Sequence, residues 1–218
     1  AGVAMLQAFL MLISRKVPQV LAGMKTRRLI TIALFGTCAF AVVNVPSTLL
    51  NDFLHIFLGP FSFLISGMFS GIMLYMLTGA LVTLIPLHGV VSLMAAIRLL
   101  LGMLAFGHIS PLVFLSYGVN AFLLELALAG FGFTTATSQS NLPVQFSWRR
   151  MATLGMACAL ADTTATFVTM QGMAVLYRLF FADWYIFMVM AVNGFLYTMI
   201  GAACGALLGA RLSGVGSD

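Results

Sequence analysis

The chain has 218 residues, of which 62% are hydrophobic and only 7% are charged, and its formal net charge is +5. Soluble domains carry about 25% charged and about 45–50% apolar residues, so the composition excludes an ordinary soluble protein. The basic residues flank apolar stretches and form no stripe with aromatic side chains, which argues against a nucleic-acid-binding protein. The composition therefore predicts an all-α integral membrane protein in contact with lipid.

The first 23 residues form a segment of their own. The apolar run from Ala1 to Ile13 is shorter than the roughly 20 residues that a membrane-spanning helix needs. No basic residue precedes it and no small-residue cleavage site follows it, so it does not resemble a secretory signal. We expect residues 1–23 to be an N-terminal extension or interfacial segment, residues 24–212 the membrane domain, and residues 213–218 a short tail.

Six apolar stretches follow, separated by polar or proline-containing segments. We predict spans at Leu29–Val45, Gly59–Ile85, His88–Phe106, Pro111–Phe133, Arg150–Gln171 and Trp184–Leu208. Three glycines interrupt the second stretch, which leaves open whether it forms one helix or two. The sequence thus predicts a bundle of about six transmembrane helices.

The basic residues indicate how this bundle is oriented. With six spans, one side of the membrane carries Arg15, Lys16, Lys25, Arg27, Arg28, Arg149, Arg150 and Arg211. The opposite side carries only Arg178. Cytoplasmic loops are enriched in lysine and arginine, so we expect both termini in the cytoplasm and a multi-pass protein of a bacterial cell membrane.

Three charged residues lie near the middle of predicted spans, where a charge costs about 2.5–3.5 kcal/mol on insertion scales. We interpret them, with polar residues at similar depth or helical spacing, as a chamber between spans three to six that opens to the outside. The predicted substrate-binding residues are Glu125, Asp162, Asn120, Asn193, Thr166, Tyr197 and Arg98. The alternative is an internal ion pair, Arg98 with Glu125 or Asp162, that only fixes helix packing.

Small residues form two stripes. Ala33, Thr37 and Ala41 follow one another at intervals of four in the first span, and Gly201, Gly205 and Gly209 do so in the last. Such stripes allow close helix approach in membranes. Because the first span carries no charge, we expect its stripe to be a partner-docking surface, while the second stripe suits internal packing or docking equally.

Several stretches resemble a known family. The opening KTRRLITIALFGTCAFA, the segments Leu58-Gly-Pro-Phe-Ser-Phe-Leu-Ile-Ser-Gly67 and Asn120-Ala-Phe-Leu-Leu-Glu125, and the ending from Asn193 to Arg211 are similar to the S-components of energy-coupling factor (ECF) vitamin transporters. The similarity is greatest to the branch linked to thiamine and its pyrimidine precursor. It covers about Met24 to Leu212.

The resemblance implies a substrate-binding subunit that docks through Ala33, Thr37 and Ala41 to a transmembrane T-component driven by cytoplasmic ATPases. It implies a vitamin-like substrate. A chamber with a carboxylate and tyrosines would suit a cationic or amino-bearing heterocycle. No catalytic, metal-binding or cofactor motif is present in the sequence, and we expect no enzyme activity. The alternatives are an accessory subunit of a larger membrane complex and, ranked last, a membrane enzyme acting on lipids.

Overall fold

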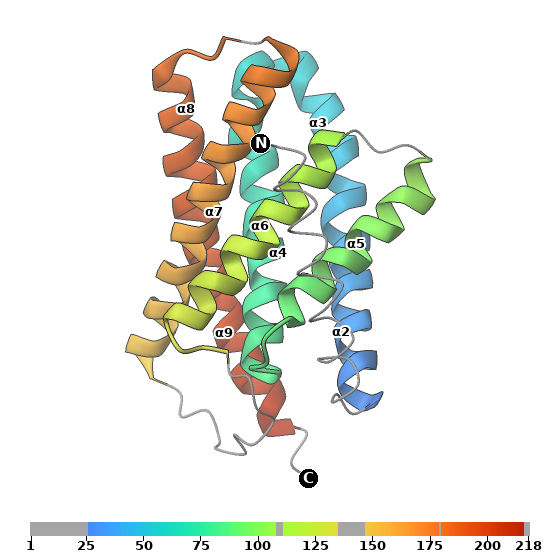
Figure 1. Ribbon diagram of the computed structural model, residues 1–218, viewed down its shortest axis with the longest axis vertical. Coiled ribbons are helices and arrows are strands. Elements are labelled where there is room, and N and C mark those ends of the chain that lie inside the picture. The colour runs from blue at the N-terminus through green and yellow to red at the C-terminus, as the bar shows by residue number, and fades with distance from the viewer. Residues whose placement is uncertain (1–25, 108–110, 135–146, 179, 216–218) are drawn as a thin grey trace.

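The protein is a bundle of helices that run up and down past one another (Figure 1). The structure, a computed structural model, describes residues 26–107, 111–134, 147–178 and 180–215. These residues form six long helical segments, which confirms the predicted all-α fold and a bundle of about six helices. Five of the segments are long and apolar enough to cross a membrane. The third segment, α5 (Val90–Phe106), has 17 residues and would reach about 25 Å.

The first segment is longer than the sequence indicates. It comprises α2 (Thr26–Ala39), the π-helical turn η1 (Phe40–Asn44) and α3 (Val45–Leu58). The prediction that this span ends at Val45 was therefore wrong. Pro46 does not end the helix because it lies in the first turn of α3, directly after the π turn, where a missing backbone N–H is tolerated.

The remaining segments follow the predicted order with shifted ends. They are α4 (Ser62–Leu84) after the short 3₁₀ turn η2 (Gly59–Phe61), α6 (Pro111–Gly130), α7 (Trp148–Tyr177), and a last segment of α8 (Asp183–Val189), the π-helical η3 (Met190–Tyr197) and α9 (Thr198–Val215). The second span is one uninterrupted helix, which settles the question that its glycines raised.

Helices α4 and α9 pack with their backbones in close contact. A Cβ atom added to Gly201 would lie 2.6 Å from the carbonyl oxygen of Ile72, and one added to Gly205 would overlap the backbone of Met76. Gly79 of α4 faces the backbone of α9 in the same way. The stripe of Gly201, Gly205 and Gly209 is therefore buried inside the bundle, as small-residue stripes allow.

One end of the bundle is basic and tightly packed. Because successive helices alternate in direction, the start of α2, the start of α7 and the end of α9 lie together (Figure 1), and they carry Arg27, Arg28, Arg149, Arg150 and Arg211. Arg178 lies at the opposite end. Two clusters of buried apolar side chains fill the half of the bundle at the basic end. One surrounds Leu128 and Leu154, and the other surrounds Ile32 and Leu81.

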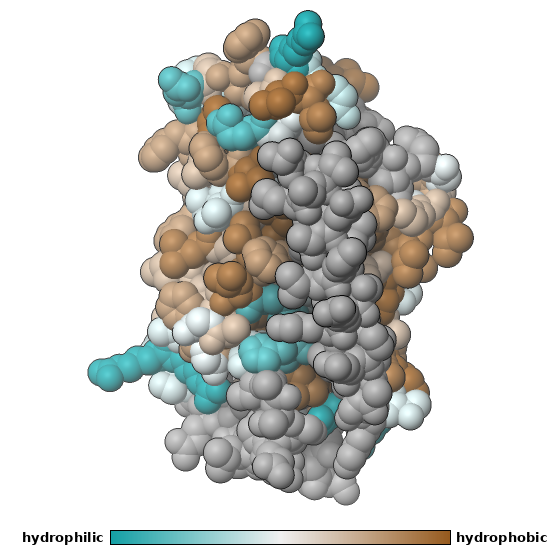
Figure 2. Space-filling view, in the orientation of Figure 1, coloured by the Kyte–Doolittle hydropathy of each residue, from teal (hydrophilic) through white to brown (hydrophobic). Residues whose placement is uncertain are grey.

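The outside of the bundle is apolar. On the face seen in Figure 2, hydrophobic residues cover much of the middle, and hydrophilic residues gather toward the two ends. The first segment, for example, exposes large apolar side chains along its length, including Leu34, Leu49 and Ile56, at 62%, 70% and 79% exposure. A continuous apolar surface of this kind indicates contact with lipid.

Candidate functional site

A polar cavity of about 350 Å³ lies in the half of the bundle away from the basic end. All six segments line it, through Asn44, Gly71, Arg98, Tyr117, Asp162 and Asn193. The prediction of a chamber between spans three to six was thus incomplete, because the first two segments also contribute. We refer to this space as the polar cavity.

Arg98 of α5 forms one side of the polar cavity with two neutral partners. It donates a hydrogen bond of 2.7 Å to the side-chain oxygen of Asn44, and it lies 3.4 Å from the hydroxyl of Tyr117. The Asn44 amide donates to the same hydroxyl at 2.6 Å, and the guanidinium carbon lies 5.1 Å from the centre of the Tyr117 ring. These contacts offset part of the cost of a buried charge inside an apolar helix bundle.

Asp162 of α7 forms a second side and is held by donors from three other helices. Its Oδ1 accepts hydrogen bonds from the Tyr75 hydroxyl at 2.5 Å and the Asn120 amide at 2.7 Å. Its Oδ2 accepts one from Thr198 at 2.8 Å, and Asn120 also donates to Tyr75 at 3.0 Å. This network ties α4, α6, α7 and α9 together and satisfies the carboxylate.

Both π-helical turns carry an asparagine into the polar cavity. Asn44 is the last residue of η1, two residues before Pro46, and Asn193 lies within η3. Gly194 of η3 packs directly on α7, because a Cβ atom there would lie 2.9 Å from the Cα of Thr163. π-helical turns inside α-helices occur frequently at functional sites.

Two buried polar atoms at the polar cavity have no hydrogen-bond partner among the described residues. They are the Nε of Arg98, which is a donor, and the side-chain oxygen of Asn193, which is an acceptor. Gly67 leaves the space that the Asn193 amide occupies, since a Cβ atom at this position would overlap that amide. Within the described residues, a donor and an acceptor in residues that line the cavity are therefore buried without the partner that such groups need.

The structure brings some of the predicted residues together and separates others. Arg98, Asp162 and Asn193 line the polar cavity, and Asn120, which does not line it, bonds to Asp162. Glu125 lies elsewhere: its carboxylate accepts hydrogen bonds of 3.0 and 3.1 Å from the backbone N–H groups of Val91 and Ser92 at the start of α5. It thereby pairs with backbone N–H groups at the start of α5 that have no hydrogen-bond partner within the helix.

Thr166 and Tyr197 are half-buried and do not line the polar cavity. The alternative interpretation, an ion pair of Arg98 with Glu125 or Asp162, does not hold within the described residues, because each of the three bonds to other groups. The stripe of Ala33, Thr37 and Ala41 faces outward and is exposed, and the Thr37 hydroxyl bonds back to the Ala33 carbonyl.

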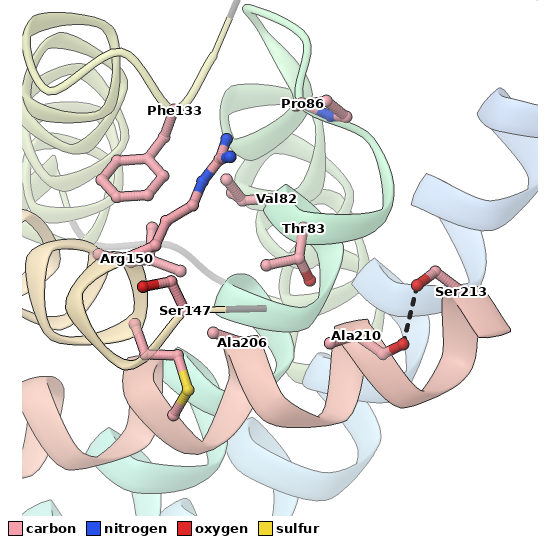
Figure 3. A pocket seen from close by; sticks show the side chains of 11 residues that line it. Val82, Thr83, Pro86, Phe133, Ser147, Arg150, Ala206, Ala210 and Ser213 are labelled. Carbon is pink, nitrogen blue, oxygen red and sulfur yellow. Dashed lines mark hydrogen bonds between the residues drawn. The ribbon is translucent and has the colours of Figure 1, made fainter. Parts of the chain in front are cut away.

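A second hollow lies at the basic end, between α4, α7 and α9 (Figure 3). Its volume is about 40 Å³, which suffices for a few water molecules but not for an organic ligand. The Arg150 side chain lies over the ring of Phe133, 5.9 Å from its centre, beside this hollow. We therefore take the polar cavity as the candidate binding site.

Sequence reasoning missed three residues of the site. Asn44 lies at the end of the first predicted span, and neither it nor Tyr75 nor Thr198 was singled out. A tyrosine inside an apolar span is a usable signal, because its buried hydroxyl needs a partner. The role of Asn44 had no such signal, since it depends on the helix continuing through η1.

The chain matches no protein-family model, no curated protein and no solved structure. Fold and site together define a class: a multi-pass α-helical membrane protein with a polar cavity inside its bundle.

Proposed function

We propose that this chain is the substrate-binding membrane subunit of an uptake transporter of the energy-coupling factor class, energised by separate ATPase subunits. The observation that carries the proposal is the polar cavity of about 350 Å³ among the six helical segments. Small-molecule sites have volumes of about 300–1,000 Å³ and a few convergent polar groups in an otherwise apolar surround. The sequence resemblance supports the same assignment.

The location of the polar cavity also supports it. The cavity lies away from the basic end, and if that end faces the cytoplasm, as the arginine distribution favours, the cavity lies in the outer half of the membrane. An importer captures its substrate from that side. Both termini are then cytoplasmic, in a bacterial plasma membrane.

The exposed stripe on α2 supports docking to a transmembrane partner. Ala33 and Ala41 are small, and the Thr37 hydroxyl is occupied by its own helix, so the surface is smooth and without free polar groups. Such a surface suits close helix packing. The proposed partners are a T-component and, through it, cytoplasmic ATPases.

Purification of the tagged chain from its native membrane tests this proposal. We expect a transmembrane subunit and ATPase subunits to co-purify, and an Ala33→Trp, Ala41→Trp variant to lose them. The exposed Leu49, replaced by tryptophan, is the matched control on the same segment and should retain them. Absence of any ATPase from the wild-type complex would contradict the proposal.

The second candidate is an accessory subunit of a larger membrane complex. The full set of hydrogen bonds around Asp162 favours it, because a satisfied carboxylate can serve packing alone. This candidate expects co-purified membrane subunits without ATPase activity and without a bound small molecule.

A further inference from the structure

The unpaired polar atoms at the polar cavity indicate which hydrogen-bonding groups a ligand must carry. Arg98 Nε lacks an acceptor and the Asn193 side-chain oxygen lacks a donor among the described residues, although both atoms are buried. A buried polar group without a partner is unfavourable, and native structures pair nearly all such groups. Both atoms belong to residues that line one cavity, so a single small molecule can complete both.

Both charged groups at the polar cavity have neutral partners, but Asp162 has the more complete set of hydrogen bonds. Asp162 accepts hydrogen bonds from Tyr75, Asn120 and Thr198. Arg98 has only neutral partners, and no acidic side chain among the described residues forms an ion pair with it. Of these two charged groups only Arg98 has an unpaired atom within the described part of the chain, so the unmet requirement is for a hydrogen-bond acceptor, and the strongest acceptor for a guanidinium is an anion.

We infer that the polar cavity binds a small organic carboxylate that also carries an N–H donor, with the carboxylate on Arg98 and the N–H on Asn193. The inference rests on the proposed function and narrows its substrate. It replaces the expected cationic heterocycle, because Glu125 lies outside the cavity and Asp162 already has its donors. The planar guanidinium matches a carboxylate in geometry as well as charge.

The helix geometry supports this assignment independently. Each of the two π-helical turns places an asparagine at the polar cavity, Asn44 against Arg98 and Asn193 opposite Gly67. Asn44 thereby holds the guanidinium in place and leaves its Nε open. Gly67 keeps the Asn193 amide at the cavity, where it can accept from a ligand.

A panel of known vitamins separates the chemical requirements. Biotin and pantothenate carry a carboxylate and N–H groups, lipoate carries a carboxylate without N–H, and thiamine and hydroxymethylpyrimidine carry no carboxylate. Binding to the full chain in detergent is measured by the shift in melting temperature and by titration calorimetry. We expect biotin or pantothenate to bind most tightly, lipoate more weakly, and thiamine and hydroxymethylpyrimidine not at all. Biotin methyl ester, in which the carboxylate is replaced by a neutral ester, should bind poorly.

Three variants assign the contacts. Arg98→Gln should weaken binding of the carboxylates at least about tenfold, and Arg98→Lys, which keeps the charge but lacks Nε, should also weaken it. Asn193→Ala should weaken binding of biotin and pantothenate but leave lipoate unchanged. Arg211→Gln is the control, since Arg211 is exposed at the basic end.

The outcomes separate this inference from the proposed function. Tight binding of thiamine or hydroxymethylpyrimidine, or carboxylate binding that both Arg98 variants leave intact, would overturn the carboxylate assignment while the binding function stands. Failure of every carboxylate to bind the wild-type chain would overturn the carboxylate assignment, and absence of ATPase subunits from the purified complex as well would overturn the proposed function. If Arg98→Gln does not fold, Arg98→Lys and Asn193→Ala still decide between the outcomes.

Discussion

Replacing Asp162 by alanine is expected to destabilise the bundle by about 2–5 kcal/mol. Hydrogen bonds between helices of membrane proteins contribute about 0.6 kcal/mol on average and at most about 1.7 kcal/mol each. Asp162 accepts three of them, from Tyr75, Asn120 and Thr198. Alanine removes all three acceptor interactions, and the Tyr75 hydroxyl is left without the carboxylate in a buried position.

Replacement by asparagine should cost far less, about 1 kcal/mol. The amide oxygen can still accept from Tyr75 and Asn120. The amide nitrogen then faces Thr198, whose hydroxyl can accept from it while keeping its 3.2 Å bond to the carbonyl of Asn193. The pair of variants thus separates the hydrogen-bond network from the negative charge.

The free energy of unfolding in mixed detergent micelles measures both variants. Thr164→Ala is the matched control on α7, because its hydroxyl is exposed and bonds only to the Leu160 carbonyl of its own helix. It should remain within about 0.5 kcal/mol of the wild type. If Asp162→Ala were as stable as this control, or no less stable than Asp162→Asn, the network would not hold the bundle together.

Two further predictions concern glycines. Gly205→Ala should destabilise the bundle by about 1–3 kcal/mol, because the new Cβ meets the backbone of Met76, which cannot move aside like a side chain. Gly130→Ala, which has open space around it, should not destabilise the bundle. Equal unfolding free energies for the two variants would refute the α4–α9 contact. Gly67→Ala should displace the Asn193 amide and abolish ligand binding in calorimetry while the helix content by circular dichroism stays unchanged; unchanged binding would show that this amide is not a ligand contact.

The number and order of the helices could be predicted because apolar length and the placement of arginines depend on local sequence alone. The position of Arg98 and Asp162 within helical segments of the bundle followed from the same counting. The partners of these residues could not be predicted, since depth along a helix does not say which helix a side chain faces. Glu125 illustrates this: it lies within its predicted span, in α6, but bonds to the start of α5.

The π-helical turns were beyond sequence reasoning for a related physical reason. A π turn is set by tertiary contacts such as that of Gly194 on Thr163, and by how the chain accommodates Pro46 inside a longer helix. Both asparagines at the polar cavity depend on these turns. The part of the site that sequence patterns missed is thus the part that packing creates.

Native mass spectrometry of the detergent-purified chain tests the central claim most directly. We predict that the wild-type protein carries one small organic molecule and that the Arg98→Gln variant, purified in parallel, is empty. A wild-type protein that is free of any small molecule, and that stays so after incubation with the vitamin panel, would contradict the account of this chain as a substrate-binding subunit.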